Sequence, residues 1–130
     1  MAGYTRVNLK EVEDQAPKFG LAPNVEFRMA RVPLELEHSG VSYQRLAPGF
    51  RQPFGHKHKR QEEVYVLVGG SARVKLDDEV VDLERWDAVR VASDTMRCIE
   101  AGPEGAEIIS IGSPNTGPGD GEIVQDWWSD

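Results

Sequence analysis

The chain has 130 residues, 39% of them hydrophobic, which is enough for one domain with a single core but short for two. Fifteen lysines and arginines against 22 aspartates and glutamates give a net charge of −7. That balance argues against nucleic acid and anionic membranes as partners, because both require a cationic surface. The sequence has no apolar run long enough to cross a bilayer, and residues 1–20 lack the apolar stretch of a signal peptide, so we expect a cytoplasmic protein.

The N-terminal segment, residues 1–24, is predicted to be an arm with one short helix. Asn8 followed by Glu11 has the spacing of a capping box. This pattern predicts a helix over about 8–15, which ends before Pro17 because proline lacks the amide hydrogen that a continuing helix needs.

From Val25 onward, apolar and polar residues alternate with the two-residue period of half-buried strands. Strands are predicted over 25–29, 41–46, 63–68, 72–76, 79–83, 88–91, 95–100 and 106–111. Turns are predicted at Gly69-Gly70 and at Asp77-Asp78, and the second of these joins a hairpin. Many short strands with frequent turn signals indicate an all-β sandwich or barrel, and no amphipathic helical segment lies between them to support a parallel sheet.

The predicted barrel spans residues 25–112, and residues 113–130 are predicted to be a C-terminal tail. The tail begins with the turn-rich segment SPNTGPGDG and leads to Trp127 and Trp128. Two exposed indole rings would be unfavourable in water. We therefore expect the pair to dock on the barrel or on a subunit partner rather than to hold a ligand.

The single cysteine, Cys98, excludes an intrachain disulfide, which fits a reducing compartment. Its neighbours Met96 and Ile99 are apolar. This environment predicts a buried, inert thiol rather than a nucleophile, because a reactive cysteine needs an electropositive and accessible surrounding.

The densest cluster of potential ligands is the segment GHKHKRQEE at residues 55–63. If residues 54–58 are extended, His56 and His58 point to the same face of a strand. With a carboxylate from the next strand, two imidazoles suit a divalent transition metal such as iron, manganese, nickel or zinc. The alternative is a pair of solvent-exposed histidines in a basic loop.

The spacing around the histidines resembles a known motif. One residue separates His56 from His58, four more precede Glu63, and Gly70 follows after a further six. This pattern closely resembles the first sequence motif of the cupin superfamily, and the resemblance extends over residues 45–111. It implies a small single-domain cupin: a double-stranded β-helix, or jelly-roll barrel, with His56, His58 and Glu63 as metal ligands.

The sequence leaves the choice of glutamate ambiguous, because Glu62 with Gly69 has the same spacing as Glu63 with Gly70. We favour Glu63, which shares a strand face with Tyr65 and places the glycine where similar family members turn. Glu62 would then be a solvated surface acid.

The second motif of the family is altered in this chain. In the aligned stretch, Trp86, Ala92 and Asp94 stand in place of the motif's Gly, Pro and Gly, and Arg97 stands at the position of the fourth ligand, a histidine. Arginine stays protonated and cannot ligate a metal, so Arg97 would either repel a dication or clamp an anionic ligand. The three remaining ligands allow an open metal site, a weaker one, or no metal.

Three functions are compatible with these features. The first is a metal-dependent enzyme, an oxygenase or an isomerase, in which Arg97 orients a small anionic substrate and Tyr65 or Gln44 lines the pocket. The second is a binding module without turnover, and the third is a structural homodimer with a vestigial histidine pair. A homodimer is expected because small cupins commonly pair through their sheets. The remaining histidine, His38, lies in a predicted turn and is expected at the surface.

Overall fold

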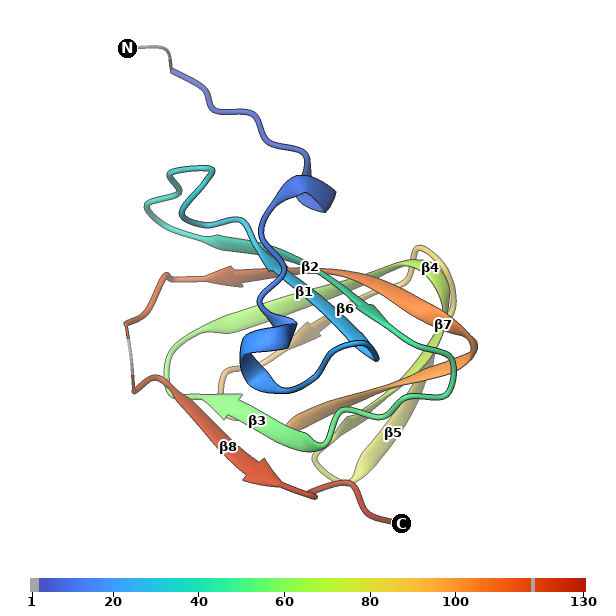
Figure 1. Ribbon diagram of the computed structural model, residues 1–130. Coiled ribbons are helices and arrows are strands. Elements are labelled where there is room, and N and C mark those ends of the chain that lie inside the picture. The colour runs from blue at the N-terminus through green and yellow to red at the C-terminus, as the bar shows by residue number, and fades with distance from the viewer. Residues whose placement is uncertain (1–2, 118) are drawn as a thin grey trace.

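The computed structural model describes residues 3–117 and 119–130 (Figure 1). Within these ranges it contains eight strands, in chain order β1 (Val25–Met29), β2 (Gly40–Leu46), β3 (Phe54–His58), β4 (Glu62–Leu76), β5 (Glu79–Leu83), β6 (Ala88–Val91), β7 (Arg97–Ser113) and β8 (Gly121–Gln125). All of their pairings are antiparallel. The prediction of an all-β fold is confirmed.

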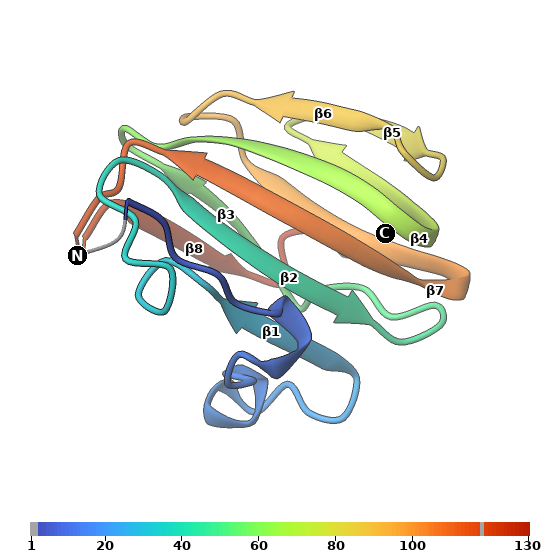
Figure 2. The same cartoon turned by 90° about the horizontal axis from the view of Figure 1, so that it is seen from above.

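The strands form one curled sheet with two layers that share the long strands β4 and β7. The first layer has the order β6-β4-β7-β2-β1 and uses the N-terminal half of β4 and the C-terminal half of β7. The second layer has the order β5-β4-β7-β3-β8 and uses the other halves. Figure 2 shows the strands of the first layer side by side. Both shared strands bend between the layers, so the sheet curls on itself. The result is a jelly-roll barrel, open at one side, with one face of each layer toward its interior.

The predicted turn at Gly69-Gly70 is wrong, because β4 continues through it as a single strand. The pairing of β4 with β7 shifts register between Leu67 and Gly69 and again between Gly70 and Ala72, so the glycines form a bulged bend. Gly70 has a positive φ of 72°, and a Cβ at this position would overlap the carbonyl oxygen of Gly105. A residue with a side chain therefore does not fit there.

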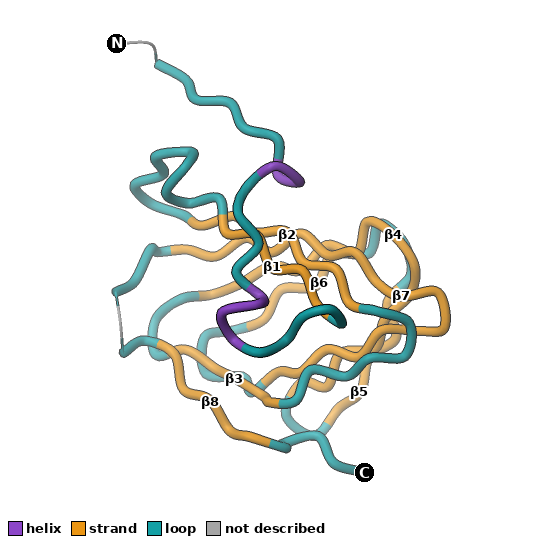
Figure 3. The backbone as a smooth tube through the Cα atoms, in the orientation of Figure 1, coloured by secondary structure: helices purple, strands orange, loops and turns teal. Residues whose placement is uncertain are grey.

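The N-terminal arm contains two short 3-10 turns rather than a helix over 8–15, and Figure 3 shows them as the helical segments before β1. The turns are Leu9–Glu11 and Ala16–Phe19. Between them, the carboxylate of Asp14 accepts a hydrogen bond of 2.9 Å from the backbone amide of Phe27 in β1. This hydrogen bond holds Asp14 against β1, so the predicted helix does not continue to residue 15. Among the described residues, no helix has the length and hydropathy needed to span a bilayer.

The core lies between the two layers and is made of inward-facing apolar side chains. Leu67, Val74 and Ile108 are fully buried in it. Cys98 is also fully buried. Burial raises the pKa of the Cys98 thiol to about 11, so the thiol stays protonated at neutral pH, in agreement with the predicted inert cysteine.

The C-terminal segment returns to the barrel and adds a strand that the sequence did not predict, since β8 pairs along its length with β3. The ring of Trp128 is buried beneath the guanidinium groups of Arg51 and Arg73. Their Cζ atoms lie 4.2 and 5.2 Å from the centroid of the ring. Trp127 packs over Gly55, where a side chain would collide with the indole ring. The tryptophan pair thus docks on the barrel, one of the two outcomes predicted for it.

Part of the outer face of the first layer, where β4 pairs with β7, is also apolar. Val64 and Val66 of β4 stand opposite Ile111 and Ile109 of β7, and the side chain of Ile111 is 40% exposed. A second copy of the chain could cover such a face. The predicted homodimer remains a prediction.

Candidate metal centre

The strands β3 and β4 bring the predicted ligands together inside the barrel. The Nε2 atoms of His56 and His58 lie 3.4 and 3.7 Å from Oε1 of Glu63. One donor atom from each of the three residues lies within 4.8 Å of the other two, a separation that one shared cation can span. No other group of three or more His, Cys, Asp or Glu residues with this geometry occurs in the described ranges.

Glu62 lies outside this cluster. Its side chain is exposed and its carboxylate is 3.9 Å from the guanidinium group of Arg90 on β6. Adjacent residues of a strand point to opposite faces, so turning Glu63 inward directs Glu62 to solvent. The geometry therefore agrees with the choice of Glu63 over Glu62.

Glu63 is the centre of a buried polar network. Its Oε1 accepts a hydrogen bond of 2.9 Å from the hydroxyl of Tyr65 and lies 3.5 Å from Nη2 of Arg97. Burial alone would raise the pKa of Glu63, but the hydrogen bond with His56, the nearby ring of His58 and the charge of Arg97 hold that pKa well below its usual range. The carboxylate therefore stays ionised, as a metal ligand must be.

Asp120, which immediately precedes β8, orients His58. Its Oδ2 lies 3.0 Å from Nδ1 of His58, and its Oδ1 accepts a hydrogen bond from the backbone amide of Arg60. Because an ionised carboxylate can only accept hydrogen bonds, Nδ1 of His58 carries a proton, and in the neutral imidazole the lone pair is on Nε2. This is the carboxylate–histidine arrangement that commonly supports metal ligands.

The residues present fit a divalent cation. Nε2 of His58 is buried and has no hydrogen-bond partner within the described part of the chain. Such an unpaired buried group costs about 1–3 kcal/mol, and a cation shared with His56 and Glu63 would remove this cost. The neighbouring carboxylate of Glu63, opposed by burial, raises the pKa of His58, so protons compete with a metal for this ring at higher pH than for an ordinary histidine.

A cavity of about 270 Å³ lies beside the three ligands. Tyr65 and Gln44, the two residues predicted to line a pocket, both line it. Much of the remaining wall is apolar and consists of Leu21, Val25, Phe27, Pro53, Phe54 and Ile123. A second hollow, of about 300 Å³, shares the three ligands and extends toward Arg31 and Asn115. The candidate metal centre thus adjoins a space large enough for a small molecule.

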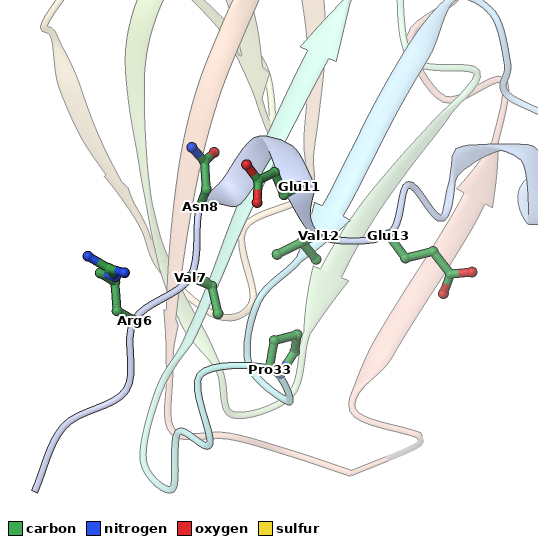
Figure 4. A pocket seen from close by; sticks show the side chains of 7 residues that line it. All are labelled: Arg6, Val7, Asn8, Glu11, Val12, Glu13 and Pro33. Atoms are coloured by element: carbon green, nitrogen blue, oxygen red, sulfur yellow. The ribbon is translucent and has the colours of Figure 1, made fainter. Parts of the chain in front are cut away.

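A separate hollow of about 780 Å³ lies between the N-terminal arm and the segment that carries Pro33. Figure 4 shows Val7, Val12 and Pro33 around it. Within the described residues it adjoins neither histidine nor cysteine, and it is not part of the candidate centre.

Solved structures of several proteins resemble this chain over most of its length. A cupin protein from Bacteroides fragilis superposes with a TM-score of 0.72 at 24% identity, covering 88% of this chain and 86% of its own. A conserved protein with a double-stranded β-helix domain from Klebsiella pneumoniae gives 0.67 at 17% identity, covering 94% and 91%. This chain has the cupin fold. Compared by sequence alone, it matches no protein-family model and no curated protein.

A third similar structure is that of Pac13, a nucleoside dehydratase from Streptomyces. It superposes on this cupin fold with a TM-score of 0.71 at 16% identity, covering 96% of this chain and 92% of its own. At such identities the likeness concerns the fold, since one fold hosts many unrelated activities.

Arg97 occupies a distinctive place in this cupin barrel. It pairs with His56 in the register of β7 with β3, and its side chain is fully buried. Its guanidinium group donates to the backbone carbonyls of Ala92, His56 and Ser93 at 3.3–3.5 Å, beside its ion pair with Glu63. Within the described residues, Arg97 lines neither hollow at the metal centre. Its predicted contact with an anionic ligand remains a prediction.

Sequence reasoning missed Asp120, which supports the centre, and Ser110, which lines the cavity. Asp120 lies in a stretch rich in glycine and proline, and only the pairing of β8 with β3 brings it next to His58. Ser110 lies in the predicted strand 106–111, which together with most of the predicted strand 95–100 forms the single strand β7, and strand parity could have indicated its inward direction.

Proposed function

We propose that this cupin binds a divalent first-row transition metal through His56, His58 and Glu63, and a small anionic molecule in the adjoining cavity. The observation that carries the proposal is the unpaired Nε2 of His58, which Asp120 holds in the metal-binding tautomer. Imidazole and carboxylate donors suit iron, manganese, nickel and zinc, and three protein ligands leave coordination positions open.

Electrostatics favour a ligand with one negative charge. Glu63 and Asp120 each carry a negative charge and Arg97 a positive one, so a bound dication leaves the centre with an excess positive charge. In the low dielectric of the barrel this excess attracts an anionic group to the open positions of the metal. Arg97 neutralises part of the charge of Glu63, from which its Nη2 atom lies 3.5 Å.

Tyr65 serves as a fixed donor to Glu63. Burial, reinforced by the charge of Glu63, raises the pKa of Tyr65 well above its usual value, so the hydroxyl stays protonated. Its hydrogen bond occupies Oε1 and fixes the carboxylate toward the histidines. A metal held there would supply Lewis-acid chemistry to a bound carboxylate or carbonyl group. An oxygenase or isomerase reaction remains the reaction class predicted from the sequence.

The test is a metal titration of full-length protein prepared without a histidine tag. We expect stoichiometric binding of added zinc or nickel, weakened at least ~100-fold in His56→Ala because one of three ligands is lost. His38→Ala is the matched control, since the side chain of His38 is 92% exposed and lines neither hollow at the centre. Protein that binds no added metal, or a His56→Ala variant that binds it equally well, would contradict the proposal.

A second candidate, metal-free binding of a small molecule, is supported by one specific observation. The ion pair of Arg97 with Glu63, at 3.5 Å, balances the ligand carboxylate without a cation. If small-molecule binding in the cavity persists unchanged after exhaustive chelation, this second candidate replaces the first.

A further inference from the structure

A row of hydroxyl groups crosses the wall of the cavity beside the metal centre. In the pairing of β4 with β7, Tyr65 stands opposite Ser110, and in the pairing of β7 with β2, Ser110 stands opposite Ser42. All three residues line the cavity of about 270 Å³. Residues opposite one another on antiparallel strands share a face, so the two serines continue the line that begins at Tyr65.

Ser110 is the exceptional member of this row. Its side chain is 94% buried, since only 6% of the residue is exposed, and its Oγ has no hydrogen-bond partner anywhere in the described ranges. Buried hydroxyls are nearly always paired, because an unpaired one loses its bonds to water without replacement. Tyr65, by contrast, donates its hydroxyl hydrogen to Glu63. An unpaired group facing a cavity is a donor available to a ligand.

The rest of the wall limits the charge of that ligand. Apart from the three metal ligands, the described residues that line the cavity are apolar or neutral, with no lysine, arginine or aspartate among them. The side chains of Gln44 and Gln52 are already joined by a hydrogen bond of 3.2 Å. A second charge on the ligand would be buried without a counter-ion, which is strongly unfavourable.

The strand geometry sets the distance between the two polar ends of the ligand. Tyr65 follows Glu63 by two residues, which is about 7 Å along a strand, and Ser110 lies one strand away, about 5 Å to the side. An oxygen that reaches Ser110 therefore lies several bonds from a carboxylate bound at the metal. A 4-oxo or 4-hydroxy acid has this spacing.

We propose that Ser110 donates a hydrogen bond to a carbonyl or hydroxyl oxygen of the ligand, and that the ligand is a small acid with one carboxylate and an apolar body. The inference rests on the proposed function, because the metal is what holds the carboxylate. Phe27, Phe54 and Ile123 form the apolar surface that receives the body of the ligand.

The test uses zinc-loaded full-length protein and three probes measured by calorimetry. They are 4-oxo-4-phenylbutanoate, 4-phenylbutanoate, which lacks the oxo group, and 4-(4-carboxyphenyl)butanoate, which carries a second carboxylate. The wild type is expected to bind the oxo acid about fivefold more tightly than 4-phenylbutanoate, the effect of one hydrogen bond. The dicarboxylate is expected to bind at least ~10-fold more weakly than 4-phenylbutanoate.

The variant Ser110→Ala isolates the proposed contact. It should lose the preference for the oxo acid while keeping the wild-type affinities for zinc and for 4-phenylbutanoate. Ser113→Ala is the matched control, because Ser113 is in the same strand but its hydroxyl is exposed and bonded to the carbonyl of His38. The control should bind all three probes as the wild type does.

Thermal unfolding separates this role from a structural one. Ser110→Ala should unfold at the same or a higher temperature, because the hydroxyl that it removes has no partner among the described residues. A clearly lower unfolding temperature would indicate a structural hydrogen bond and overturn the inference.

The zinc titration is completed first, so that the two proposals fail separately. Absence of zinc binding overturns the proposed function and the inference that rests on it. The inference alone is overturned if the protein binds zinc but has equal affinity for the oxo acid and 4-phenylbutanoate. It is also overturned if Ser110→Ala lowers the affinity for both probes equally. Failure of both monocarboxylates to bind the loaded protein overturns the proposed ligand class.

Discussion

The inward face of β4 has two ends of opposite character. Near its start it carries Glu63 and Tyr65, which join a charged network, whereas farther along it carries Leu67 and Val74, which are fully buried among apolar side chains. A two-residue alternation directs Glu63, Tyr65 and Leu67 inward, and the bulged bend at Gly69-Gly70 shifts this alternation so that Val74 also faces inward. The contrast shows that the strand period determines which residues are buried, and that neighbours on other strands determine what a buried residue can do.

The two ends also differ in how burial affects stability. At the apolar end, removal of each side chain from water stabilises the fold directly. At the other end, burial of Glu63 is unfavourable unless Arg97, Tyr65 and the histidines compensate it. The candidate metal centre therefore depends on its polar partners, whereas the core depends on shape and volume.

The largest expected effect is loss of the charge that balances Glu63. We expect Arg97→Met to destabilise the metal-free protein by about 4 kcal/mol in urea unfolding, because it leaves a buried carboxylate without its counter-ion. The double variant Arg97→Met with Glu63→Gln should recover much of this loss. A single-variant loss below ~1 kcal/mol would mean that the ion pair contributes little and that the two ends differ less than we infer.

Truncation at the apolar end should affect stability alone. Leu67→Ala is expected to cost about 3 kcal/mol of unfolding free energy through lost burial and a residual cavity. Its zinc affinity, measured by calorimetry under folding conditions, should equal that of the wild type. Val80→Ala, at a 46% exposed position of β5, is the control and should be nearly neutral. A large change in zinc affinity in Leu67→Ala would show that the ends are coupled.

The residue that orients His58 is expected to affect zinc affinity and not stability. Asp120→Asn should weaken zinc binding about 10- to 100-fold while the urea midpoint stays close to that of the wild type, because it alters the support of one ligand ring. Glu122→Gln, an exposed carboxylate of β8, serves as the control and should keep the wild-type zinc affinity. Equal affinities in Asp120→Asn and the wild type would remove Asp120 from the centre.

The smallest expected effect is on the pH dependence of stability. The pKa of Glu63 lies below its ordinary value of 4.5 in the folded chain, so its stabilisation is present above pH 4.5 and is lost as the pH falls through the folded pKa. The pKa of His58 is raised above 6.5, so its stabilisation is present below pH 6.5 and is lost as the pH rises through the folded pKa.

The two shifts together define one window for the metal-free protein. The difference in unfolding free energy between the wild type and Glu63→Gln should be largest between pH 4.5 and 6.5. It should fall by roughly 1 kcal/mol below and above this range. Urea titrations of both proteins across this range measure it. Bound zinc should move the pH of greatest stability upward, because zinc binds only neutral imidazole rings. A pH-independent difference would contradict the shifts.

Much of the barrel could be predicted from local patterns in the sequence. The alternation in 25–29 and the hairpin at Asp77-Asp78 appear in the structure as predicted, because a two-residue period and a tight turn are properties of adjacent residues. The spacing of His56, His58 and Glu63 likewise predicted a cluster that the fold assembles, since it depends on two neighbouring segments of the chain.

The remaining features were decided by contacts between residues far apart in the sequence. The pair Asp120–His58 arises only because β8 pairs with β3, and the positions of Arg97 and Ser110 beside Glu63 and Tyr65 arise only because β7 pairs with β4 in the barrel. Sequence alone thus determined the alternation of the strands and the chemistry that the candidate ligands could supply. The tertiary structure decided their partners, because a hydrogen bond or an ion pair requires a distance that no local period specifies.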